Sequence, residues 1–70
     1  MQKLNKITLN ELLDGVATRC TYKGYTVIYQ NGYVTIFKDK YITSFTYGIL
    51  FHTLAQFKAR VKAEINNYIK

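Results

Sequence analysis

The chain has 70 residues, a formal net charge of +6 and a single cysteine, and these figures exclude several classes of protein. A chain this short forms one domain, residues 1–70, with little room for a deep cleft beside its core. Cys20 alone cannot form an internal disulfide, which excludes a secreted disulfide scaffold. One His and one Cys cannot build a metal cluster. We therefore expect neither a metal nor a cofactor.

The sequence also predicts where in the cell the protein is located. Its longest aliphatic and aromatic run is Ile49-Leu50-Phe51, whereas a membrane span needs roughly 20 apolar residues. Met1–Lys6 is not followed by the apolar stretch of a signal peptide. We expect a cytoplasmic protein with no membrane partner. The abundant Ile, Lys, Asn, Tyr and Phe have AT-rich codons, which points to a low-GC bacterium or its phage.

The first predicted element is a short helix over residues 9–14. Thr8 at the N-cap and Glu11 three residues later form a capping box, in which each side chain satisfies the other's backbone donor. Gly15 then supplies a left-handed stop.

A meander of three or four antiparallel strands should follow, because the apolar period changes to two. Three dipeptides divide this segment evenly, and each is read as a two-residue turn: Lys23-Gly24, Asn31-Gly32 and Asp39-Lys40. The strands they define are 18–22, 25–30, 33–38 and 41–47, of which 18–22 is either a strand or an extended lead-in.

A long helix over residues 54–69 is the last predicted element. Thr53 and Gln56 repeat the capping box. Its apolar stripe contains Leu54, Phe57, Val61, Ile65 and Tyr68. The predicted fold class is therefore α+β, with a short helix, the meander, and a long helix packed on one face of the sheet.

Counting outward from the three turns assigns each strand residue to a face. The core face should carry Cys20, Tyr22, Tyr25, Val27, Tyr29, Val34, Ile36, Tyr41, Phe45 and Tyr47. The outer face should carry Arg19, Thr21, Thr26, Ile28, Gln30, Tyr33, Thr35, Phe37, Ile42, Ser44 and Thr46. In this register Phe37 and Ile42 lie directly opposite each other.

Two groups of residues are candidate binding sites. The first and third turns lie at the same end of a meander, which brings together Lys23, Lys38 and Lys40 beside tyrosines. Ammonium groups neutralise phosphates and phenol rings stack on unpaired bases, so this pattern favours nucleic acid. The alternative is that Lys38 extends past the tyrosines to water and the other lysines only solubilise the turns.

The outer face is the second candidate. It has no acidic residue and one cation, and its larger side chains are Arg19, Ile28, Tyr33, Phe37 and Ile42. Such a mixed surface fits a protein partner, a homodimer or a nucleic-acid groove. Alternatively, residues 1–16 cover this face; the sequence does not decide between that arrangement and packing beside the long helix.

The sequence offers little for catalysis, and we expect no enzyme activity. Glu11 has a capping role, and Asp39 sits in a turn. His52 lacks an evident carboxylate to orient it. Cys20 points toward the core, where a thiol is an inert apolar group.

The turns and caps resemble those of small phage and mobile-element proteins over about residues 22–65. The residues that carry the resemblance are Tyr22-Lys23-Gly24-Tyr25, Asn31-Gly32-Tyr33, Ser44-Phe45, Thr53-Leu54 and Phe57-Lys58. Some proteins of this kind are anti-CRISPR or other anti-defence inhibitors, which occupy a surface on a host nuclease complex. The order of sheet and helix also resembles integrase arm-binding domains, whose exposed sheets present several Arg residues; here only Arg19 does so.

The first functional hypothesis is therefore a non-catalytic basic binding protein of phage or mobile-element type, an inhibitor of a host nucleic-acid-handling complex. The alternative is a domain that binds DNA or RNA directly through its lysine and tyrosine rim. A third possibility is a homodimeric structural module that uses its outer face.

Overall fold

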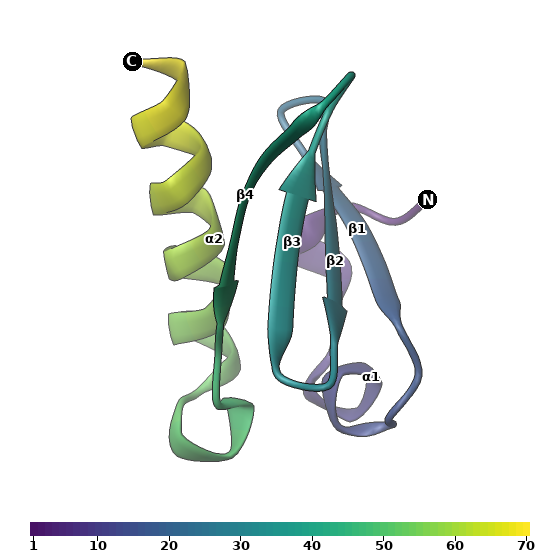
Figure 1. Cartoon of the computed structure of the whole chain (residues 1–70). Coiled ribbons are helices and arrows are strands. Elements are labelled where there is room, and N and C mark those ends of the chain that lie inside the picture. Colours follow the sequence, from purple (N-terminus) through teal and green to yellow (C-terminus); the bar gives the residue numbers. More distant parts are fainter.

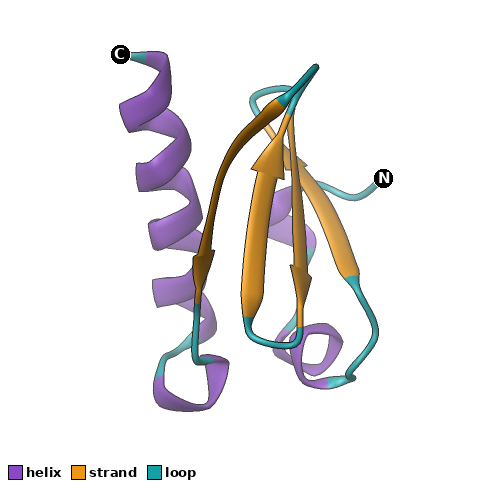
Figure 2. Cartoon of the chain, viewed as in Figure 1, coloured by secondary structure: helices purple, strands orange, loops and turns teal.

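The computed structural model describes residues 1–70 and has the predicted α+β architecture (Figures 1 and 2). A 3-10 turn, η1 (Leu4–Lys6), and a short helix, α1 (Leu9–Leu13), precede the sheet; a second 3-10 turn, η2 (Ile49–Phe51), and helix α2 (Leu54–Ile69) follow it. The strands are β1 (Thr18–Tyr22), β2 (Tyr25–Gln30), β3 (Tyr33–Phe37) and β4 (Tyr41–Thr46). They pair antiparallel in the order β1-β2-β3-β4. The meander is confirmed, with 18–22 as a full strand.

Both α-helices begin at the predicted capping boxes. The Glu11 backbone N–H donates to Thr8 Oγ1 at 3.3 Å, and Glu11 Oε1 accepts from the Thr8 backbone N–H at 3.0 Å. At α2, the corresponding distances between Thr53 and Gln56 are 3.1 and 2.8 Å. Local side-chain chemistry therefore fixes where both helices start.

Two of the three connections between strands are the predicted two-residue turns. Lys23 and Gly24 have φ values of 51° and 83°, and Asn31 and Gly32 have 52° and 79°. Positive φ at both central residues is what a type I′ turn requires, and its twist matches that of the flanking strands.

The third predicted turn is wrong. Phe37 pairs with Tyr41 and Ile36 pairs with Thr43, so three residues connect β3 to β4 and Ile42 is the extra residue of a β-bulge. The reason lies in the connection itself, where neither Asp39 nor Lys40 has the positive φ of a type I′ turn.

The bulge exchanges the faces of two side chains. Tyr41 shares the outer face with its partner Phe37, is 63% exposed, and has its hydroxyl 3.0 Å from Ser44 Oγ. Ile42 is half-buried and packs against the core. The predictions that Ile42 lies on the outer face opposite Phe37, and Tyr41 on the core face, are therefore both wrong.

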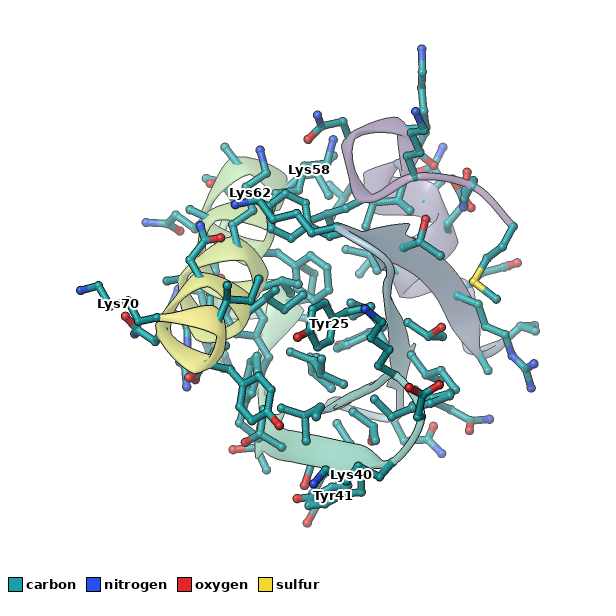
Figure 3. All side chains as sticks on the ribbon, turned by 90° about the horizontal axis from the view of Figure 1, so that it is seen from above. Tyr25, Lys40, Tyr41, Lys58, Lys62 and Lys70 are labelled. Atoms are coloured by element: carbon teal, nitrogen blue, oxygen red, sulfur yellow. The ribbon has the colours of Figure 1, made fainter.

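The core lies between the inner face of the sheet and two segments that cover it together. Figure 3 looks along the strands and shows side chains filling the space between the sheet, α2 and the N-terminal turns. The N-terminal segment joins α2 there, since Lys58 Nζ donates to the Asn5 carbonyl at 3.0 Å. Residues 1–16 thus pack beside α2 and leave the outer face of the sheet uncovered. The buried core residues are Leu4, Ile7, Leu12, Cys20, Val27, Tyr29, Val34, Ile36, Tyr47, Ile49, Phe57, Val61 and Ile65.

Candidate functional site

The structure separates the site residues predicted from the sequence into two main groups. The β1–β2 and β3–β4 connections lie at the same end of the molecule, at the top of Figure 1, as expected for a meander. This end brings together Lys23, Lys38 and Lys40, whereas the outer face carries Arg19, Ile28, Tyr33 and Phe37. Ile42 leaves its predicted place on the outer face, because the bulge turns it inward, where it lines a hollow together with Lys38 and Lys40.

Positive charge is concentrated at this end, because the last turns of α2 also reach it (Figure 1). Of the four acids, Asp39 lies in the β3–β4 connection itself, and Glu11 and Asp14 belong to α1 and its cap at the other end. Glu64, on α2 between Lys62 and Lys70, pairs with Arg60 at 3.3 Å. We call this region the lysine end; its cations are Lys3, Lys23, Lys38, Lys40, Lys62 and Lys70.

Tyrosine rings hold several of these lysines in place. Lys23 Nζ lies 5.4 Å from the centroid of the Tyr22 ring, and Lys62 Nζ lies 5.9 Å from the same centroid. Lys38 Nζ lies 5.2 Å from the centroid of Tyr25. In this arrangement the aliphatic stems cover the rings while the ammonium groups keep contact with water. The lysine end therefore presents ordered cations to a partner.

The lysine end also contains a hollow of about 330 Å³, open to solvent. Tyr25 begins β2 and Tyr68 lies in the last turn of α2, and their rings meet edge to face with centroids 6.1 Å apart. Figure 3 shows Tyr25 near the centre of this end, between α2 and the sheet. The hollow is lined by Tyr25, Lys38, Asp39, Lys40, Ile42 and Tyr68.

Sequence reasoning missed the contribution of α2 to this site. The sequence places Tyr68 in the apolar stripe of the helix, and in the structure its side chain is 50% exposed. The signal is a difference in length: a 16-residue helix is about 24 Å long, whereas six-residue strands span about 20 Å. The last turn of α2 extends past the strands, so Tyr68 lines the hollow.

The outer face of the sheet is the second candidate surface. None of its residues is buried, and Tyr33 and Tyr41, at opposite ends of the β3–β4 pair, are 58% and 63% exposed. Arg19 is its one cation, and Phe37 and Ile28 are half-buried among Thr and Ser side chains. The face is therefore neutral, partly aromatic and uncovered.

An exposed apolar pair lies at the opposite end of the molecule, and sequence reasoning did not assign it to a site. Leu50 and Phe51 in η2 are 81% and 86% exposed. The Phe51 ring folds back over Gly48, where an added Cβ would come within 2.9 Å of Phe51 Cδ2. Gly48 thus permits the conformation of this loop.

The other potentially reactive side chains, Cys20, Glu11 and His52, each contact neighbouring groups of the fold. Cys20 is 2% exposed, and burial, with a smaller effect of Glu11, raises the pKa of its thiol to about 11. Hydrogen bonds from the Gln2 side chain and the Thr8 backbone lower the pKa of Glu11. The His52 ring lies 4.8 Å from that of Tyr47. No three His, Cys, Asp or Glu side chains gather as a metal site.

Comparison with known proteins yields no relative. No family model matches the chain, and no curated protein or solved structure matches it significantly. None of its helices combines the length and apolar character needed to cross a membrane. The candidate sites are thus defined by the geometry of this chain alone.

Proposed function

We propose that this chain is a non-catalytic protein that binds nucleic acid through its lysine end. The observation that carries the proposal is the concentration of cations around a tyrosine-lined hollow, with Asp39 as the one acid that lines it. Lysines that neutralise phosphates release condensed counterions, and this release drives binding to nucleic acid.

The charge of the lysine end is available to a partner because the protein does not neutralise it internally. The one ion pair of the chain joins Arg60 to Glu64. Lys23 donates instead to the neutral Asn66 side chain at 2.8 Å, and Lys38 lies over a ring. Neutral partners fix these side chains and leave their full positive charge in place.

The dependence of binding on salt tests the proposal. Fluorescence anisotropy with labelled single-stranded and hairpin DNA gives the slope of log affinity against log salt concentration. Each phosphate contact contributes about 0.7 to this slope for a single strand and about 0.9 for a duplex. We expect Lys40→Gln to lower the slope by about one contact and the double variant Lys38→Gln/Lys40→Gln by about two.

Lys6→Gln is the matched control, because it removes the same charge from an exposed residue of η1, outside the lysine end. It should leave the slope unchanged. An equal effect of Lys6→Gln and Lys40→Gln would show nonspecific attraction by net charge. No binding at low salt contradicts the proposal outright.

The uncovered outer face supports a second candidate function, contact with a protein partner. The N-terminal segment could have covered this face but packs on the other side of the sheet, and Tyr33 and Tyr41 remain more than half exposed. A neutral face with aromatic groups fits a protein better than phosphates. This is the surface expected of a phage or mobile-element inhibitor that occupies a host nuclease complex.

Phe37→Asp tests the second candidate, and Phe51→Asp is its control because it adds the same charge at the opposite end. Capture from a host lysate should recover the same nuclease component with the wild type and Phe51→Asp but not with Phe37→Asp. Capture that Phe37→Asp leaves unchanged contradicts it. Light scattering after size exclusion identifies the alternative, a homodimer through the same face, as a dimer that Phe37→Asp dissociates.

A further inference from the structure

We propose that the hollow of the lysine end receives one unpaired base of a single-stranded nucleic acid, while Lys38 and Lys40 contact the flanking phosphates. The inference rests on the proposed nucleic-acid function and specifies its ligand. It follows from the contents of the hollow, which combine flat aromatic surface with lysine ammonium groups on one rim.

Three separate elements build the floor and walls of the hollow. Tyr25 at the start of β2 and Tyr68 in the last turn of α2 stand nearly perpendicular, with an interplanar angle of 79°. The β-bulge turns Ile42 of β4 inward, so that it lines the hollow together with these rings. Because Tyr68 is half exposed, part of its ring surface remains free for a ligand.

The cations lie on the β3–β4 connection, directly beside the rings. Lys38 Nζ is 5.2 Å from the centroid of Tyr25, so an aromatic surface and an ammonium group are neighbours in the same hollow. A nucleotide presents the same pair of features, a flat base and an adjacent phosphate. An acidic peptide would satisfy the lysines but would leave the two rings without a stacking partner.

The shape of the site favours a single strand over a duplex. In a duplex each base face is already stacked on its neighbours, and the grooves are read by a helix or ribbon that enters them. Here the rings of Tyr25 and Tyr68 line a hollow between the β3–β4 connection and the last turn of α2, and a base that stays in its stack presents no free face to them. An unpaired base can leave its stack and enter, as in other proteins that bind single strands.

Binding of three probes tests the inference: oligothymidylate, a hairpin duplex with the same number of phosphates, and thymidine monophosphate. Tyr68→Leu removes the ring but keeps an apolar helix-forming side chain, and Tyr68→Phe restores the ring. We expect Tyr68→Leu to weaken oligothymidylate binding about five- to tenfold, at the lower part of the range for base–aromatic stacking. The salt slope and duplex affinity should not change, and Tyr68→Phe should bind as the wild type does.

Phe51→Leu is the control, since it removes an exposed ring at the opposite end. A second measurement needs no variant: the ring protons of Tyr25 and Tyr68 should shift upfield in NMR spectra when oligothymidylate is added. Ring protons that do not move overturn the inference. It is also overturned if thymidine monophosphate binds as tightly as the oligonucleotide, which would indicate a site for free nucleotides.

The same experiments distinguish a failure of this inference from a failure of the proposed function. If Tyr68→Leu binds oligothymidylate as the wild type does while Lys38→Gln/Lys40→Gln still lowers the salt slope, the lysine end binds phosphates only. The proposed function then stands and the inference is wrong. If none of the nucleic-acid probes binds at low salt, both are wrong.

Discussion

Lys38 holds its ammonium nitrogen 5.2 Å from the centroid of the Tyr25 ring, at the edge of the hollow between the sheet and α2. The contact restricts a long side chain that would otherwise sample many rotamers. Less conformational entropy is then lost when the ammonium group meets an anion. The same connection carries Asp39, whose carboxylate opposes that anion.

The first prediction concerns this carboxylate. Asp39→Asn removes the negative charge from the lysine end and should strengthen binding to single-stranded DNA about two- to fivefold at low salt, the range of an exposed charge pair. The gain should shrink as salt screens the charges. Asp14→Asn, which removes the same charge near α1, should have no effect in the same anisotropy titration. Weaker binding by Asp39→Asn would mean that the carboxylate contacts the ligand favourably.

The second prediction concerns the core beneath α2. Phe57 is 1% exposed, and its ring meets those of Tyr29 and Tyr47 edge to face at 5.5 and 5.3 Å. Phe57→Ala should lower the free energy of unfolding by about 3–5 kcal/mol, which is most of the stability of a small domain. Urea denaturation followed by circular dichroism measures the loss.

Phe51→Ala is the control for that experiment, because the same truncation at an 86% exposed position should change the free energy of unfolding by no more than about 0.5 kcal/mol. Similar losses for Phe51 and Phe57 would mean that the Phe51 side chain, like its neighbour Ile49, packs in the folded core.

The third prediction concerns pH. Burial raises the pKa of the Cys20 thiol from its ordinary 9.0 to about 11, so between these values the folded state keeps a proton that the unfolded state has lost. The folded state then binds more protons, and its stability falls as pH rises through this window. The urea midpoint of the wild type should therefore fall more steeply between pH 9 and 11 than that of Cys20→Ala. Parallel curves would contradict a buried, protonated thiol.

The parts of the fold that the sequence predicts are those that local chemistry determines. Thr8 and Thr53 satisfy backbone donors within a few residues, and Gly24 and Gly32 supply the positive φ that their turns need. No distant part of the chain has to be known for either inference. The apolar alternation then specifies which face of β1–β3 is buried.

The parts that the sequence did not predict depend on longer-range geometry. Asp39-Lys40 contains no residue that demands positive φ, so nothing in it distinguishes a two-residue turn from a three-residue connection with a bulge. The place of Tyr68 depends on how far α2 extends past the sheet, which the periodicity of the helix alone does not reveal. The sequence did predict that Lys23, Lys38 and Lys40 lie at one end of the molecule. In an antiparallel meander the first and third connections between strands lie at the same end of the sheet.

The last prediction follows from this difference between the connections. The double variant Asp39→Asn/Lys40→Gly gives the β3–β4 connection the Asn-Gly pair that forms the β2–β3 turn, and Asn-Gly strongly favours a type I′ turn. We expect the register to shift so that Phe37 pairs with Ile42 and the bulge disappears. In NMR spectra, cross-strand contacts between Phe37 and Ile42 should replace those between Phe37 and Tyr41.

The shift would also move Ile42 to the outer face and take it out of the hollow, because alternate residues of a strand face opposite sides. Binding of oligothymidylate by the double variant should then be weaker than binding by Asp39→Asn/Lys40→Gln, which has the same charge but no glycine. Equal affinities despite a shifted register would show that Ile42 does not shape the ligand site. An unshifted register would show that packing of Ile42 against the core, rather than the conformation of the connection, maintains the bulge.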